Sequence, residues 1–447
     1  MSKLTSRAFI ATAQPSQSMS ERQRKFIVKL TVLISGGMFI DGFILGGIGI
    51  VMPAITESLK LSLAWQGLIG ASTLIGIFFG GPLGGYLADK VGRRPMFTID
   101  LAIFLCGSIA QFFVHEAWHL FVVRFIMGVA IGADYAIGWP MLAEFAPSRL
   151  RGRLLATQEI GWYVGYLVAY ALGWVLTMSA AADWSMILGL STIPTLIVLL
   201  MRFGTPESPH WLMSKGRRAE AMELAAAYME EAEQRDLLVH RIAGKAGFGR
   251  LFAPDCIKST IFVSVFWICN VTPYFAIGTF IPVVLNQLGL HDGLTGGLAL
   301  NGIAVLGTIV AAWLVEHVGR RNLAIPPFWI STVALVIVGL FSNGSTTVIM
   351  VAFLTFSFVN AISTALTGVY PGEVFPTEVR GVGVGFATAA SRVGAAFGTF
   401  VLPITIQSLG IVVAMFIAAG ISLFGGVVSQ LLAPETKGKL LSEVSAG

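Results

Sequence analysis

Two aspartates lie inside long apolar stretches, where an ionised side chain is costly and is therefore a candidate for function. Asp41 falls in the stretch 27–52, and Asp134 falls in the stretch 119–144. A carboxylate that water reaches from alternate sides of a membrane can bind a proton on one side and release it on the other. The two aspartates therefore predict proton coupling, although each could instead form a hydrogen bond between helices.

Three further charged residues share this apolar setting. Glu159 lies toward one end of the stretch 153–177, where it could extend a proton path or form a hydrogen bond at the rim. Arg124 could coordinate an anion or could extend its side chain toward the membrane surface. Arg392 is the best candidate for binding a negatively charged solute, because a deeply placed cation needs an anionic partner. A fixed internal ion pair is the alternative for Arg392.

Polar and amphipathic side chains also interrupt the apolar helices expected in the second half of the chain. A few of them could line a pocket with one polar edge and one aromatic wall. Packing and hydrogen bonding between helices is the alternative for each. These candidates are Trp267, Asn270, Tyr274, Asn301, Asn360 and Thr364. Pro273 and Pro282 predict a kink in the same region, because proline interrupts the helical hydrogen-bond ladder.

Searches for other chemistry find no support in the sequence. There is no Gly-x-x-x-x-Gly-Lys-Ser/Thr loop, so ATP is not expected as an energy source. The six histidines lie near helix ends or in loops without a metal-binding pattern, and the three cysteines are scattered. We therefore expect no metal, no cofactor and no enzymatic activity.

The composition indicates what must position these residues. The chain has 447 residues, of which 55% are hydrophobic and 12% charged, whereas a soluble domain carries about 25% charged residues. Apolar runs long enough to cross a bilayer predict an all-α membrane protein with twelve transmembrane helices in two pseudo-symmetric six-helix bundles. The expected spans are 27–52, 66–88, 95–114, 119–144, 153–177, 184–203, 259–286, 294–315, 323–341, 346–370, 382–408 and 410–432.

The placement of basic residues predicts the orientation. Nearly all of the 29 Lys and Arg residues fall in the terminal tails or the even-numbered loops. Only Lys60 lies in an odd-numbered loop, and we place only Arg124 and Arg392 inside spans. Both termini and the long loop are therefore expected in the cytoplasm. The formal charge of +5 reflects this asymmetry and gives no reason to expect a nucleic-acid partner.

Three charged patterns occur twice in the same order. Asp89 to Arg94 returns as Glu316 to Arg321, 227 residues later. The pattern Glu-x-x-Pro…Arg-Gly at 144–152 returns at 373–381, and Pro-Glu-Ser at 206–208 returns as Pro-Glu-Thr at 434–436. The chain is therefore duplicated, and two like halves of a membrane protein usually enclose a substrate path. We divide it into bundles at 1–203 and 259–447, joined by a linker with amphipathic helices at 204–258.

These motifs resemble the signature of the major facilitator superfamily over essentially the whole chain. Pro206 to Pro209 and the pattern at 373–381 resemble the sugar-porter and organic-ion branches. The residues around Asp41 and the segment from Arg124 to Tyr135 resemble the phosphate and aromatic-acid proton symporters. The chain also resembles a group of bacterial metabolite symporters typified by the YaaU protein. The resemblance implies a bacterial inner-membrane protein that transports its substrate by alternating access.

The resemblance also implies a network of charges that holds the cytoplasmic gate shut. Carried over by motif, its first half comprises Asp89, Arg93, Arg94, Glu144, Arg151 and Glu207. The second half mirrors it with Glu316, Arg320, Arg321, Glu373, Arg380 and Glu435. Such pairs can break and reform as the bundles rock.

Two departures from the family patterns narrow the expected coupling residues and substrate. The aromatic-acid symporters carry a second acid where this chain has Ile44, which leaves Asp41 and Asp134 as the coupling candidates. The paired glutamines of the sugar porters are absent around Cys269 and Asn270, which disfavours hexose transport. We expect a monomeric symporter that uses the proton gradient to import a small organic anion, such as a sugar acid, an aromatic acid or another carboxylate. A passive uniporter of a polar metabolite and a membrane sensor that does not transport are the alternatives.

Overall fold

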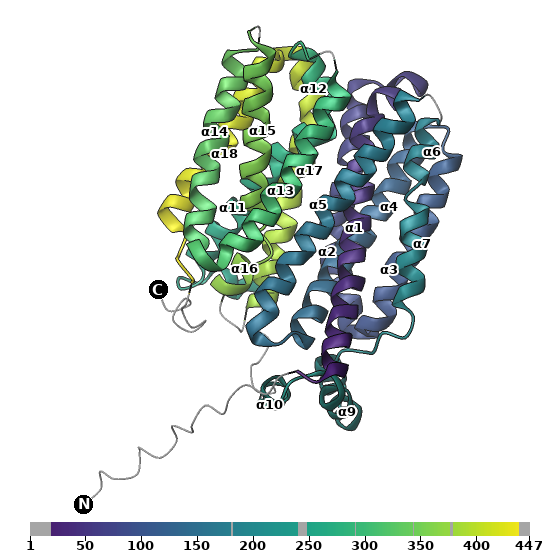
Figure 1. Cartoon of the computed structure of the whole chain (residues 1–447), viewed down its shortest axis with the longest axis vertical. Coiled ribbons are helices and arrows are strands. Elements are labelled where there is room, and N and C mark those ends of the chain that lie inside the picture. The colour runs from purple at the N-terminus through teal and green to yellow at the C-terminus, as the bar shows by residue number, and fades with distance from the viewer. Residues whose placement is uncertain are drawn as a thin grey trace, which may run out of the picture.

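The computed structural model describes residues 19–179, 182–239, 248–290, 292–342, 344–375 and 379–437. Within these ranges, twelve helical segments are long and apolar enough to cross a bilayer. The prediction of an all-α membrane protein is confirmed, and the helices form two bundles that stand side by side (Figure 1).

The first bundle contains the first six spans. Its opening helix begins six residues before the expected span, because Ser20 caps it through a hydrogen bond from the backbone N–H of Gln23. Its elements are α1 (Glu21–Ser58), α2 (Leu63–Val91), α3 (Arg93–Ala110), η1 (Gln111–Phe113), α4 (Ala117–Phe145), α5 (Ser148–Met178), α6 (Trp184–Gly189) and α7 (Thr192–Arg202).

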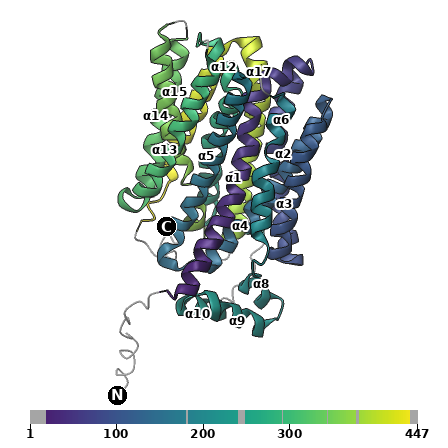
Figure 2. The same cartoon turned by 45° about the vertical axis from the view of Figure 1, so that its right-hand side comes forward.

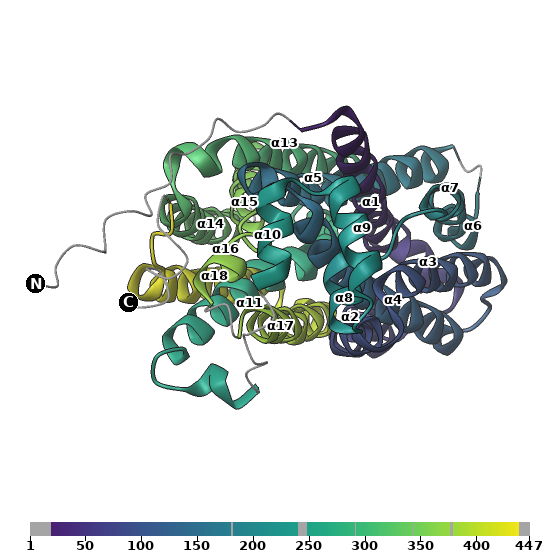
Figure 3. The ribbon, with the colours of Figure 1, turned by 90° about the horizontal axis from the view of Figure 1, so that it is seen from below.

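Short helices connect the two bundles at one end of the molecule (Figures 2 and 3). They are α8 (Pro209–Ser214), α9 (Arg218–Tyr228) and α10 (Glu231–Val239), followed by the 3-10 turn η2 (Phe248–Phe252). We call this end the linker face and the opposite end the far face. The linker is attached to the first bundle, because Nε2 of Gln23 on α1 donates to the carbonyl oxygen of Met229 at 2.8 Å.

The second bundle contains the remaining six spans. The expected kink is present as a break at Phe280, just before Pro282 in the first turn of the next helix. Its elements are α11 (Ile257–Thr279), α12 (Ile281–Gln287), α13 (Gly293–Val318), α14 (Arg320–Leu340), α15 (Thr346–Thr364), α16 (Tyr370–Val374), α17 (Arg380–Leu409) and α18 (Ile411–Leu432).

Close backbone contact between α1 and α5 fixes the interior of the first bundle. A Cβ atom at Gly42 would overlap the carbonyl oxygen of Trp162, and one at Gly165 would overlap the carbonyl oxygen of Phe39. Only glycine permits this approach at both positions. The contact sets the positions of Asp41 and Trp162, which neighbour these two sites on their helices.

The two bundles also pack closely in the half toward the far face. A Cβ atom at Gly49 on α1 would lie 2.8 Å from the carbonyl oxygen of Gly278 on α11. Nε1 of Trp174 on α5 donates to Oγ1 of Thr295 on α13 at 3.1 Å. These contacts close the interior of the protein toward the far face.

Candidate functional site

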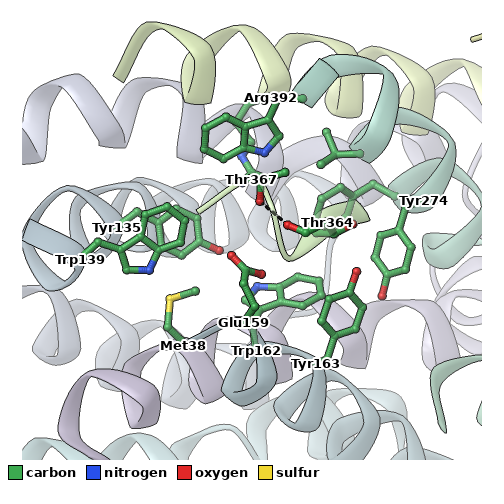
Figure 4. A pocket seen from close by; sticks show the side chains of 13 residues that line it. Met38, Tyr135, Trp139, Glu159, Trp162, Tyr163, Tyr274, Thr364, Thr367 and Arg392 are labelled. Carbon is green, nitrogen blue, oxygen red and sulfur yellow. Dashed lines mark hydrogen bonds between the residues drawn. The ribbon is translucent and has the colours of Figure 1, made fainter. Parts of the chain in front are cut away.

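A central cavity of about 40 Å³ lies where the two bundles face each other (Figure 4). The first bundle contributes side chains from α1, α4 and α5, namely Met38, Tyr135, Trp139, Glu159, Trp162 and Tyr163. The second contributes Trp267, Val271, Tyr274, Phe275, Thr364, Thr367 and Arg392. In this conformation the space is small, because a single water occupies about 10–15 Å³ by the same measure.

Aromatic rings form most of the cavity wall and also join the bundles. The ring centroids of Trp162 and Phe275 are 5.9 Å apart, and those of Tyr163 and Tyr274 are 5.7 Å apart. Tyr135 stacks on Trp139 at 5.8 Å. These distances are typical of favourable aromatic pairs. The wall therefore offers flat apolar faces to a ligand.

Arg392 supplies the cation of this cavity. The side chain is buried, and its guanidinium carbon lies 5.7 Å from the ring centroid of Tyr135 and 5.6 Å from that of Phe275. Within the described part of the chain it forms no hydrogen bond or ion pair, and its Nε atom has no partner. Cation–π contact compensates only part of the cost of burying such a charge. An anion in the cavity would supply the missing partner.

Several hydrogen-bonding groups around the cavity are buried without a partner in the described structure. They are Nε1 of Trp139, the hydroxyl groups of Tyr163 and Tyr274, and Nδ2 of Asn270. Buried polar groups are almost always hydrogen-bonded in native proteins. This set therefore matches a ligand that is rich in oxygen atoms.

Asn270 and Asn360 support the polar edge of the cavity from behind. Oγ1 of Thr364 donates to Oδ1 of Asn270 at 2.6 Å, and Nδ2 of Asn360 donates to the carbonyl oxygen of Asn270 at 3.0 Å. Thr364 itself lines the cavity, as does Thr367. The two asparagines thus orient Thr364.

Two of the predicted binding residues are not at the cavity. Both terminal nitrogens of Arg124 lie 3.4 Å from the carbonyl oxygen of Ile44, and the side chain is fully buried. Nδ2 of Asn301 donates to the carbonyl oxygen of Gly297 within α13. The interpretation of Arg124 as a side chain that extends outward is wrong, because it is enclosed among helices.

Two further charged residues join the predicted aspartates inside the first bundle. Nη1 of Arg202 lies 3.1 Å from Oδ1 of Asp100, and its Nη2 lies 3.0 Å from Oδ1 of Asp134. Asp41 is fully buried, and neither of its carboxylate oxygens has a hydrogen-bond partner among the described residues. Our statement that only Arg124 and Arg392 lie inside spans was therefore wrong, because Arg202 is also a buried cation. Its position at the end of a span concealed a side chain that turns inward.

Our sequence analysis missed Asp100 and the aromatic residues of α4 and α5. Asp100 lies in the third apolar run and could have been found as another charge inside a span. Tyr135 and Trp139 on α4 are four residues apart and share a helix face, whereas Trp162 and Tyr163 on α5 are consecutive. Their residue type alone equally suits packing against lipid or core.

The predicted gate charges of the first half meet at the linker face. Nη2 of Arg93 lies 2.8 Å from Oε1 of Glu144. The backbone N–H groups of Arg93 and Arg94 donate to the carboxylate of Glu207, with the shorter bond at 3.0 Å. Nη2 of Arg151 donates to the carbonyl oxygen of Ala146 at 3.3 Å. The carbonyl oxygen of Asp89 accepts a hydrogen bond from Nε1 of Trp211.

The second half repeats this arrangement. Nη2 of Arg320 lies 2.9 Å from Oε1 of Glu373. The backbone N–H groups of Arg320 and Arg321 donate to the carboxylate of Glu435 at 3.0 and 3.1 Å. Glu207 and Glu435 therefore satisfy the first N–H groups of α3 and α14, where a carboxylate is favoured. The side chains of Glu316 and Arg380 lie outside the described part of the structure.

Hydrogen bonds shift the titration of Glu435. Partial burial by itself raises the pKa of this carboxyl group, but backbone N–H groups of Lys437, Arg320, Arg321 and Thr436 together hold its pKa below the ordinary value.

Among the described residues, no group of three or more His, Cys, Asp or Glu side chains is arranged to hold a metal ion.

Comparison with known proteins gives consistent matches over the whole chain. A family model described as "Sugar (and other) transporter" matches residues 5–447. The putative metabolite transport protein YaaU of Escherichia coli K12 is 37% identical over 443 residues, covering 97% of this chain and 98% of that protein. The inner membrane metabolite transport protein YgcS of the same organism is 35% identical over 425 residues, covering 95% and 94%.

The fold is also similar to solved structures. The xylose transporter XylE from E. coli, in a partially occluded inward-open conformation, aligns with a TM-score of 0.81. The alignment covers 93% of this chain and 100% of that chain at 20% sequence identity.

Proposed function

This chain belongs to the sugar (and other) transporter family of the major facilitator superfamily, and we propose that it is a proton-coupled symporter of small organic anions. The observation that carries this proposal is Arg392, a buried cation in the central cavity without an ion-pair partner among the described residues. A bound carboxylate would neutralise it with the planar, paired geometry that guanidinium groups favour.

The surrounding groups favour a sugar acid within this class. Unpartnered donors on Trp139, Tyr163, Tyr274 and Asn270 suit the hydroxyl oxygens of a polyol chain. The aromatic faces suit its C–H groups or a flat ring. An aromatic acid would use the same faces but would leave more of the donors without partners.

Proton coupling is assigned to carboxylates near the cavity. Asp41 is fully buried and has no hydrogen-bond partner in the described part of the chain, and Glu159 lines the cavity itself. A proton on Asp41 would offset the negative charge that an anionic substrate brings into the bundle. Substrate and proton would then move together, because either charge alone makes the buried site less favourable.

Alternating access requires the two bundles to rock about this cavity. The predicted units 1–203 and 259–447 would move as rigid bodies, with 204–258 as their linker. The excess of basic residues at the linker face supports a cytoplasmic location for it and for both termini. The gate networks around Glu207 and Glu435 would then lie on the cytoplasmic side of a monomeric transporter in the bacterial inner membrane.

A neutral sugar is the second candidate substrate. The family description and the xylose transporter among the structural neighbours favour it. The hydroxyl groups of Thr364 and Thr367, which line the cavity, could also bind a sugar that has no carboxylate. This candidate leaves Arg392 without a partner, and for that reason it ranks second.

Uptake by liposomes containing the purified protein would separate the candidates. Radiolabelled D-gluconate, 4-hydroxybenzoate and D-xylose would be offered with and without an inward proton gradient. We expect gradient-driven accumulation of D-gluconate that an uncoupler abolishes. Accumulation of D-xylose alone would replace the anion proposal with a sugar proposal. Uptake insensitive to the uncoupler would indicate a uniporter, and absence of flux despite binding would indicate a sensor.

A further inference from the structure

A four-residue cluster of charges lies inside the first bundle, and none of its members lines the central cavity. It joins four helices, with Asp41 from α1, Asp100 from α3, Asp134 from α4 and Arg202 from α7. Arg202 contacts both Asp100 and Asp134, so its guanidinium group joins these two carboxyl groups. The cluster thus contains three carboxyl groups and one guanidinium group.

Helix α1 connects Asp41 to the other three residues of this cluster. A Cβ atom at Gly37 would overlap Nη2 of Arg202 and crowd Oδ2 of Asp134, so these groups lie directly against the helix at that point. Asp41 follows four residues later on the same face, about 6 Å along the axis. It is therefore one helical turn from the contact between Arg202 and Asp134.

The same face of α1 leads to a second cavity at the linker face. This cavity of about 160 Å³ is lined by Lys29, Leu33, Thr205 and Tyr228, among others. Leu33 lies one turn before Gly37, and Oγ1 of Thr205 donates to the carbonyl oxygen of Arg202 at 2.7 Å. The cavity has room for several water molecules. Lys29, Leu33, Gly37 and Asp41 thus form one stripe from this cavity to Asp41.

We propose that protons leave Asp41 through Asp134 and Asp100 to the linker-face cavity, by a path inside the first bundle that is separate from the substrate cavity, with Arg202 as its positioning residue. This inference rests on the proposed proton coupling. In each step the proton leaves a carboxyl oxygen and joins a carboxylate oxygen of the next residue, and finally a water molecule in the linker-face cavity. Arg202 compensates whichever carboxylate is left ionised.

The charges that face this path are few among the described residues. Arg202 on α7 lies at its centre, Arg392 on α17 acts on Asp41 from the central cavity, and Lys29 lies at its mouth. Glu159 on α5 belongs to the central cavity. Substitutions in the cluster should therefore change proton binding without changing the residues that contact substrate.

Proton binding can be measured without a substrate, as the transient current that a pH jump produces in proteoliposomes on a sensor electrode. Gly37→Ala would push Arg202 away from Asp134, so the carboxyl groups would hold their protons more tightly. The pH midpoint of the current should rise by about one unit or more. Asp100→Asn removes a negative charge from the cluster, so its midpoint should fall. Gly47→Ala is the matched control on α1, because its Cβ atom would lie 3.6 Å from Leu188 in ordinary contact.

Opposite shifts in the two variants, with an unchanged Gly47→Ala midpoint, would establish the cluster as the proton path. Wild-type midpoints in both variants, when both elute as monodisperse protein, would overturn it. Asp41→Asn tests the proposed function separately, since a full current in that variant removes Asp41 as the proton carrier. A failure of the sugar-acid assignment leaves these currents unchanged, because they involve no solute.

The mouth of the path can be tested by reversible blocking. Lys29→Cys would be made in a Cys106→Ser background, since Cys106 is exposed whereas Cys256 and Cys269 are buried. Reaction with a bulky methanethiosulfonate should abolish the transient, and a reducing agent should restore it. Ser214→Cys is the control, because Ser214 is an exposed residue of α8. A transient that survives modification at residue 29 would exclude the linker-face cavity as the exit.

Discussion

Trp174 and Thr295 form a hydrogen bond across the two bundles, at 3.1 Å between Nε1 and Oγ1. The bond joins α5 to α13 on the far-face side of the central cavity, where backbone contact through Gly49 also holds the bundles together. It must break when the far face opens, so it contributes to the balance between the two states of the transporter.

Trp174→Phe should shift this balance toward the state that is open at the far face. Loss of one exposed hydrogen bond is worth about 1 kcal/mol, which changes the population ratio about fivefold. Spin labels on cysteines introduced at the exposed positions Lys60 and Gln287 would report the distance between the bundles by double electron–electron resonance. Thr295→Ala should give the same shift, and the double variant should add little to it. Additive shifts would show that the two side chains act independently.

Arg392→Gln should weaken binding of the anionic substrate about 100-fold, because the buried site then lacks its cation. Arg392→Lys keeps the charge but loses the paired geometry, so about a tenfold loss is expected. Isothermal titration with D-gluconate would measure both losses. Equal affinity in wild type and Arg392→Gln would show that the guanidinium group does not contact the substrate.

Tyr163→Phe should separate binding from stability. The Tyr163 hydroxyl is buried and has no hydrogen-bond partner within the described structure, so its removal should leave the thermal midpoint unchanged or slightly raised. Substrate affinity should fall about fivefold, because one hydrogen bond to the ligand is lost. Tyr370→Phe provides the contrast, since the Tyr370 hydroxyl donates to the carbonyl oxygen of Pro434. That variant should lose stability while keeping its affinity. The reverse pattern would place the ligand elsewhere.

Glu435→Gln should destabilise the second bundle in a pH-dependent manner. The folded protein holds the pKa of Glu435 below its ordinary value, so the carboxylate contributes stability at pH above about 4.3. This contribution is lost as the pH falls through the lowered pKa. The thermal midpoint of the variant in detergent should therefore lie below wild type at pH 7, and the two should converge in acid. A constant difference across the titration would contradict the assignment.

The sequence predicted the fold well because its signals are strong and local. Apolar runs, loop charges and the repeated motifs each indicate a span, a face or a symmetry, and the gate residues Arg93, Glu144, Arg320 and Glu373 meet as ion pairs. The breaks within spans were predicted less completely than the spans themselves. The break at Phe280 was expected because of Pro282, whereas the break between α6 and α7 was not predicted, although Gly189 ends α6 and Pro194 lies in the first turn of α7.

The site was predicted only in part, because a residue's position along a span does not give the face it occupies. Arg392, Trp267, Tyr274 and Thr364 line the cavity. Arg124, of similar type and depth, is enclosed elsewhere. Helix rotation is set by close contacts such as that of Gly42 with Trp162, which depend on the partner helix. Arg202 shows the same limit, since a terminal arginine can extend outward or fold into the bundle.

Coupled movement of an organic anion and protons through the cavity at Arg392 is the central claim. Its most direct test is the external pH of a weakly buffered suspension of proteoliposomes after addition of D-gluconate. We expect alkalinisation in wild type that is absent with D-xylose, with Asp41→Asn, with Arg392→Gln and in protein-free liposomes. Alkalinisation with D-xylose and none with D-gluconate, or gluconate entry without any pH change, would contradict the account.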